Sequence, residues 1–263
     1  MPLTMLSITA TASRRKRPLI FIPGWGFDGR VLRLRGELPY PPPADLSASG
    51  GRSALDNLPA PGGLPVPGGL PVPGGLSAPD GLIDPLTLST DLVAWLDQQN
   101  IERCELLGWS MGGLCALEFT RLYPQRVTAL HLLAVRDAWP AAEIAEIGRD
   151  LTKQPEGFLR SFYRKSLLGY REAYRRFQQE LEADYLVQAL AAQAVLHRGL
   201  DFLAAPRPSN LALTNSCRVY CRHGRRDLIA PPAERLLLPG ADYQLLEHGG
   251  HALFLDYLPP DGL

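Results

Sequence analysis

The stretch Leu106-Leu107-Gly108-Trp109-Ser110-Met111-Gly112-Gly113 contains the pattern G-x-S-x-G, with Ser110 at its centre. The apolar run before the pattern predicts a buried strand over residues 104–109, and residues 111–122 predict a helix. A G-x-S-x-G pattern between a strand and a helix is typical of a nucleophile elbow, a sharp turn that exposes a serine hydroxyl above a sheet. We therefore expect Ser110 to be a catalytic nucleophile.

Short apolar runs alternate with amphipathic segments on both sides of this elbow. Further strands are expected at residues 19–22, 127–135, 217–221 and 243–246. A helix capped by Ser89 or Thr90 is expected ahead of the elbow strand, because apolar residues then recur at helical spacing. This alternation predicts an α/β fold with a mostly parallel central sheet and helices on both faces.

Two segments of different composition interrupt the alternation. Residues 139–203 have long helical patterns and no strand, which predicts a helical cap inserted into a core made of residues 1–138 and 204–263. Residues from about 39 to 85 are rich in glycine and proline, with the repeat G-G-L-P-V-P. Proline lacks a backbone donor and fixes φ, so this repeat suits neither a helix interior nor a central strand. We expect an inserted loop there; a proline-rich ligand for a partner domain is the alternative.

Charge and composition narrow the classes of function. The 27 Lys and Arg residues balance 27 Asp and Glu residues, which argues against a nucleic-acid binder. No apolar run approaches the ~18–20 residues of a membrane span, and the basic cluster at residues 14–17 follows the apolar stretch, unlike a secretory signal. The four cysteines are scattered, so we expect no metal site. These features predict a reduced, cytoplasmic enzyme.

A serine nucleophile needs a histidine base that is oriented by a carboxylate. We expect His251 to be the base, because it lies in the loop after the last expected strand, and His248 is the alternative. We expect Asp227 to be the acid, because it follows a strand end 24 residues before His251; Asp137 is the alternative. The order serine, acid, histidine then differs from that of chymotrypsin- and subtilisin-type proteases.

A tetrahedral intermediate also needs two hydrogen-bond donors for its oxyanion. The backbone amide of Met111, the residue after the nucleophile, is expected to be one donor. The Trp25 amide is expected to be the other, because the flanking Gly24 and Gly26 permit close approach of the backbone.

These motifs resemble those of the α/β-hydrolases and, within them, the family of pimeloyl-acyl-carrier-protein methyl ester esterases of biotin synthesis. Pro23-Gly24-Trp25-Gly26-Phe27 is similar to that family's His-Gly-Trp-Gly-Leu turn, with Pro23 in place of the histidine. The elbow is similar to Leu-Gly-Trp-Ser-Leu-Gly-Gly. The likeness continues at Phe158-Leu159, and at the segments 227–231 and 251–254.

The resemblance implies a serine esterase that needs no cofactor and acts on a methyl ester carried by an acyl carrier protein. It implies contacts of Phe158 and Phe162 with the substrate chain, and we expect a monomer. Acyl carrier proteins are acidic, so basic cap residues are expected to steer docking: Lys153, Arg160, Arg164, Lys165, Arg171, Arg175 and Arg176. A small-ester or thioester hydrolase of another substrate is the alternative.

Two departures from the family concern the edges of the sheet. Residues 39–45 are too rich in proline for the strand that the family has there, and only 12 residues follow His251, which predicts a short or absent final helix.

Overall fold

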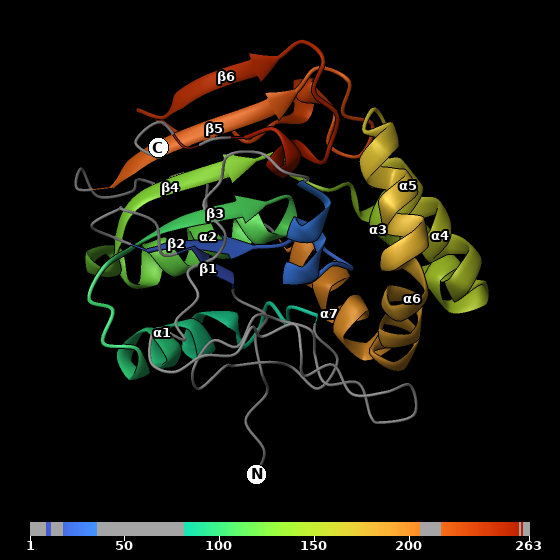
Figure 1. Cartoon of the computed structure of the whole chain (residues 1–263), viewed down its shortest axis with the longest axis horizontal. Helices are drawn as coiled ribbons and strands as arrows, with labels where there is room; N and C mark the ends of the chain where they lie inside the picture. Colours follow the sequence, from blue (N-terminus) through green and yellow to red (C-terminus); the bar gives the residue numbers. More distant parts are fainter. Residues whose placement is uncertain (1–8, 12–17, 36–81, 206–216, 258, 260–263) are drawn as a thin grey trace, which may run out of the picture.

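The computed structural model describes residues 9–11, 18–35, 82–205, 217–257 and 259. Among them, six strands form one sheet whose spatial order follows the sequence (Figure 1). The strands are β1 (Thr9–Thr11), β2 (Leu19–Ile22), β3 (Cys104–Trp109), β4 (Val127–Leu133), β5 (Arg218–Gly224) and β6 (Asp242–Leu246). β1 pairs antiparallel with β2, and β2 to β6 are parallel. The mostly parallel sheet predicted from the sequence is confirmed.

The first turn of the helix α2 (Met111–Leu122) packs on the sheet with almost no side chains between the two backbones. A Cβ atom on Gly108 would lie 2.5 Å from the Gly113 Cα, and one on Gly112 would lie 2.2 Å from the carbonyl oxygen of Ile22. Both distances are far shorter than any ordinary carbon contact. Because Gly108 and Gly112, on either side of Ser110, have no side chains, α2 packs directly against β3 and the end of β2. The helix α1 (Leu88–Gln98) packs against α2.

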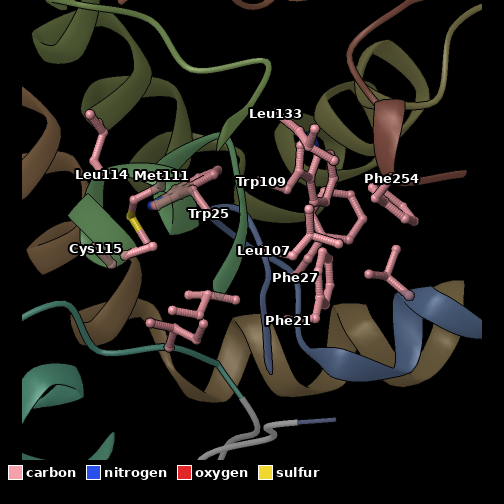
Figure 2. Close-up of a cluster of buried hydrophobic side chains, with 14 of the residues drawn as sticks. Phe21, Trp25, Phe27, Leu107, Trp109, Met111, Leu114, Cys115, Leu133 and Phe254 are labelled. Atoms are coloured by element: carbon pink, nitrogen blue, oxygen red, sulfur yellow. The ribbon is translucent and has the colours of Figure 1, made fainter. Parts of the chain in front are cut away.

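On the opposite face of the sheet, the 3₁₀ helix η4 (Leu253–Leu255) packs against β5, and a second 3₁₀ helix, η1 (Gly29–Arg35), packs on η4. The Phe254 ring of η4 lies 5.6 Å from that of Phe21 and 4.6 Å from that of Trp109. Figure 2 shows this aromatic cluster on one side of the strands and Met111, Leu114 and Cys115 of α2 on the other. Both faces are thus covered, but within the described residues the second face is covered by 3₁₀ rather than α helices.

Several element boundaries differ from the sequence expectation, among them the first residues of β5 (Arg218, not Cys217) and β6 (Asp242, not Tyr243). The N-cap of α1 is Thr87, not Ser89 or Thr90, because the Thr87 and Leu88 amides both donate to the Asp84 carbonyl and start the helix earlier. β4 ends at Leu133, two residues early, because Ala134 has a φ of 53°. β5 continues through Gly224, since its pairing with β6 extends to that residue.

In the described part of the chain between β4 and β5 there are five helices, which we call the cap: α3 (Ala141–Lys153), α4 (Pro155–Ser166), α5 (Arg171–Glu180), α6 (Glu182–Ala191) and α7 (Gln193–Ala204). The cap lies beside the carboxyl ends of the parallel strands, towards which the arrowheads of β4, β5 and β6 point (Figure 1). Loops at the carboxyl ends of parallel strands are where α/β folds place their sites. Most of the glycine- and proline-rich insertion expected at 39–85 lies outside the described residues.

We predict that Gly112→Ala destabilises the protein, because the added methyl group must push α2 away from β2. Overpacking of this kind costs about 1–3 kcal/mol or more. Gly157→Ala is the matched control: nothing lies within 4 Å of a Cβ on Gly157 in α4, and alanine is favoured over glycine in helices by ~1 kcal/mol. Urea unfolding measures both changes. Equal stability of the two variants would contradict the packing argument.

Candidate active site

Ser110 lies in a strained backbone conformation between β3 and α2. Its φ is 54° and its ψ is −121°, a region that non-glycine residues rarely occupy and that tends to occur at functional sites. The Ser110 amide donates to the Leu133 carbonyl at 2.8 Å, which ties the turn to β4. The close packing of α2 holds the turn from its other side. This geometry is that of a nucleophile elbow, and the Gly113 amide donates to the Ser110 carbonyl at 2.9 Å, so the helix starts directly at the serine.

His251 and Asp227 form a buried hydrogen-bonded pair. The distance between His251 Nδ1 and Asp227 Oδ2 is 2.8 Å, and the two residues are 2% and 3% exposed. The carboxylate can only accept, so the His251 proton belongs on Nδ1 and leaves Nε2 as an acceptor. The other carboxylate oxygen, Oδ1, accepts bonds from the Ile229 and Ala230 amides at 2.9 and 2.8 Å.

These contacts determine the ionisation of Asp227. Burial alone would raise its pKa, but the charge and hydrogen bond of His251, the Ala230 amide and nearby His223 together hold the pKa of this carboxyl below its ordinary value. Asp227 is therefore an anion at neutral pH, as a carboxylate that orients a histidine must be.

The alternative base and acid lie elsewhere. His248 is exposed, and its Nδ1 lies 3.1 Å from the Arg226 guanidinium. Asp137 is exposed after β4, where its amide donates to the Glu234 carbonyl. Of the two candidate acids, it is Asp227 that contacts His251.

Trp25 lies in a β-turn that follows β2. The Phe27 amide donates to the Gly24 carbonyl at 3.1 Å, and Gly26 has a φ of 73°, the sign that a type II turn requires at its third residue. A Cβ on Gly24 would lie 3.3 Å from the Ser110 Cβ, so the turn passes next to the serine. We call residues 24–27 the oxyanion turn, since the Trp25 amide is our candidate donor.

The chain matches the α/β hydrolase fold family over residues 85–257. The chain belongs to the α/β hydrolase family. It is 29% identical over 165 residues to a pimeloyl-acyl-carrier-protein methyl ester esterase of Salmonella newport, an alignment that covers 57% of this chain and 64% of the relative. The chain thus spans slightly less than two thirds of that relative's length.

Solved structures share the fold. A hydrolase from Oleispira antarctica matches 96% of this chain and 90% of its own, with a TM-score of 0.61 and 12% identity. A bromoperoxidase from Bacillus anthracis matches 65% of this chain and 68% of its own, with a TM-score of 0.54 and 16% identity. At these identities the likeness shows the fold alone.

The two candidate substrate-contacting residues of this α/β hydrolase, Phe158 and Phe162, both lie in α4 and face Trp25. Their rings are 6.2 and 4.9 Å from the indole. They also line a cavity of about 510 Å³ between α3, α4 and the loop after Asp227. In addition to apolar residues, three carboxylates line this cavity: Glu143, Glu146 and Asp150. Lys165 lines it as well.

Several of the basic cap residues are ion-paired. Arg160 bonds to Glu156 at 3.0 Å and, across the cap, to Glu182 at 2.7 Å. Arg175 and Arg176 pair with Glu172 and Glu180 in their own helix. These partners neutralise much of the positive charge expected from the sequence, whereas Arg164 and Arg171 are exposed.

Two further residues support the pair His251 and Asp227, and no sequence motif pointed to this role for either of them. The Trp109 indole donates to the His251 carbonyl at 2.8 Å. His223 in β5 is 5% exposed; its Nε2 donates to the Ala230 carbonyl at 2.6 Å and lies 3.7 Å from Asp227 Oδ2. A sequence feature that could have indicated this role for His223 is its position at the end of a strand, four residues before Asp227.

Among the described residues, no helix combines the length and apolarity needed to cross a bilayer. No group of three or more His, Cys, Asp and Glu side chains suited to hold a metal ion occurs in the same part of the chain.

We predict that His223 makes folding stability depend on pH. Burial lowers the pKa of His223 below its ordinary 6.5, so below pH 6.5 the unfolded chain binds a proton that the folded chain does not. Stability is therefore lost as pH falls through this range, by up to ~1.4 kcal/mol per pH unit.

His223→Gln, which keeps a donor, removes this contribution. The stability of the parent relative to the variant should therefore fall between pH 7.5 and pH 5.5, as measured by urea unfolding at each pH. The exposed His248, substituted as His248→Gln, is the control, and a constant difference for His223→Gln would contradict the prediction.

Proposed function

We propose that this α/β hydrolase is a serine esterase that cleaves the methyl ester of a pimeloyl chain carried by an acyl carrier protein, as in biotin synthesis. The observations that carry the esterase proposal are the strained elbow at Ser110 and the buried hydrogen-bonded pair of His251 and Asp227. The similarity to curated methyl ester esterases supports the choice of substrate.

In the proposed reaction, Ser110 Oγ attacks the ester carbonyl carbon while His251 Nε2 takes the hydroxyl proton. Asp227 holds the histidine by its Nδ1 proton and stabilises the imidazolium that forms. The oxyanion accepts hydrogen bonds from the Met111 and Trp25 amides. His251 returns the proton to the departing methoxide, which leaves as methanol. Water, activated by the same histidine, then releases the carboxylic acid and regenerates Ser110.

An ester or thioester hydrolase of another substrate is the second candidate, and one observation favours it. Glu146 and Asp150 along the cavity next to Phe158 and Phe162, and the ion pairs of Arg160, Arg175 and Arg176 with glutamates, make the cap less positive than an acidic partner requires. Both candidates use the same catalytic residues and differ only in the partner.

We predict that Ser110→Ala abolishes ester hydrolysis and leaves thermal unfolding near that of the parent, since the hydroxyl contributes little packing. Loss of such a nucleophile costs on the order of 10⁴–10⁶ in rate. Asp227→Asn should cost about 10⁴, because the amide favours the wrong histidine tautomer, whereas Asp137→Asn serves as the control. Hydrolysis of p-nitrophenyl butyrate is the assay. Activity of Ser110→Ala within tenfold of the parent would refute the mechanism.

We predict that Arg164→Glu and Arg171→Glu each raise KM for acyl-carrier-protein methyl esters several-fold and leave hydrolysis of p-nitrophenyl butyrate unchanged. The effect should fade as salt rises, because exposed charges are screened beyond ~8–10 Å. Arg121→Glu on α2 of the core makes the same change of charge at an exposed site and is the control. An unchanged KM in both cap variants would favour the second candidate.

A further inference from the structure

The oxyanion turn is followed by a buried charged residue, Asp28, that bonds to the cap. Asp28 is 2% exposed, and its Oδ2 pairs with Arg30 Nη2 at 2.8 Å. The Tyr185 hydroxyl of α6 donates to Asp28 Oδ1 at 2.8 Å and lies 3.3 Å from the Asp28 amide, from which it accepts. Arg30 also bonds to Gln188 of α6, and its guanidinium lies 4.7 Å from the centre of the Tyr185 ring.

A buried cluster of charged and polar side chains contributes little to the free energy of folding. Removing charges from water is costly, and apolar side chains of similar volume would stabilise the same space as well or better. Each buried polar atom instead demands its partner at one distance and direction, because an unsatisfied one is penalised by about 1–3 kcal/mol. The cluster therefore constrains geometry: Asp28 can occupy only the position that Tyr185 and Arg30 define.

The cap also holds the other end of the turn. The Trp25 indole donates to the Leu196 carbonyl of α7 at 2.8 Å, and a Cβ on Gly199 would lie 2.5 Å from the indole, so α7 and Trp25 are in close contact. Between these two anchors, the Phe27 ring packs against Trp109, Tyr163 and Tyr185. The backbone that carries the Trp25 amide is thus attached to α7 on one side and to α6 on the other.

We propose that Tyr185, acting through Asp28, is a positioning residue of the cap that sets the place of the Trp25 amide in the oxyanion hole. The cap then completes the catalytic centre in addition to covering it. This inference rests on the proposed role of the Trp25 amide as an oxyanion donor. Its consequence is that a hydroxyl deep in the cap affects the chemical step for any ester, whatever the acyl chain.

Tyr185→Phe tests this role against a closely matched variant, Tyr163→Phe. The two rings belong to one buried aromatic cluster, with centroids 5.9 Å apart, and each substitution removes one hydroxyl and keeps the ring. Among the described residues the Tyr163 hydroxyl has no hydrogen-bond partner, whereas the Tyr185 hydroxyl bonds to Asp28. The pair therefore separates loss of this contact from general loosening of the cluster.

We expect Tyr185→Phe to lower kcat for p-nitrophenyl butyrate by tenfold or more with KM within twofold, since complete loss of an oxyanion donor costs about 10²–10³. The rate at which a fluorophosphonate labels Ser110 should fall by a similar factor, because its transition state uses the same donors. Tyr163→Phe should leave both rates within twofold of the parent, and thermal unfolding should show both variants folded.

The outcomes distinguish the two proposals. A Tyr185→Phe enzyme with parental kcat and labelling rate, or equal losses in both variants, would overturn the positioning role while Ser110 chemistry stands. A parent whose Ser110 is not labelled would overturn the esterase proposal and this inference together. Labelling without cleavage of acyl-carrier-protein esters would leave the inference intact and change only the substrate.

Discussion

The contact between α2 and the strands beneath it is the constraint on which the site depends. Because Gly108, Gly112 and Gly113 carry no side chains, the helix backbone lies against β3 and against the carbonyl groups of Ile22 and Pro23. That contact forces the chain to turn sharply at Ser110, which is why this residue has a positive φ. It also brings the end of β2, and hence the oxyanion turn, beside the serine. One packing requirement thereby places the candidate nucleophile and the candidate oxyanion donors within the same small volume.

The remaining site residues are held by hydrogen bonds between loops, not by regular elements. The Asp227 loop is closed on itself by the Ile229 and Ala230 amides and is fastened to β5 through His223. The His251 loop is fastened to β3 through the Trp109 indole. The bonds of the Ala230 amide, His223 and Trp109 are buried and that of the Ile229 amide is partly buried, so they are strong and geometrically demanding. The ring of Trp109 packs against His251 on the one hand and against Phe27 and Phe254 on the other; Figure 2 shows the three rings of Trp109, Phe27 and Phe254 together.

Membership of the α/β hydrolase family establishes the fold of this chain. It does not establish the substrate, because the choice of substrate depends on the parts of the structure that differ between family members. A bromoperoxidase and a hydrolase share the fold of this chain at low identity, as expected for a fold that carries many activities. In this protein the aromatic rings next to Trp25 come from α4, and their surroundings include carboxylates. The cap therefore has two parts in the proposed chemistry. It supplies the walls that select a substrate, and it anchors both ends of the oxyanion turn.

Local sequence patterns were sufficient to predict the helices and strands whose formation depends on residues close to one another in the sequence. The strand β3 and the helix α2 have the boundaries that the elbow pattern predicts, because apolar periodicity and the paired glycines are local signals.

Positions decided by distant contacts were not predictable in the same way. Asp137 and Asp227 are both turn aspartates in the sequence, and only the folded chain shows which one meets His251. Arg160 looked like a free surface charge, yet it pairs with Glu182, 22 residues away on another helix. The bond between Asp28 and Tyr185 joins residues 157 positions apart, and neither has a sequence pattern that names the other. Burial explains the difference: a polar group removed from water must find whichever partner the packing brings to it, and packing is a property of the whole fold.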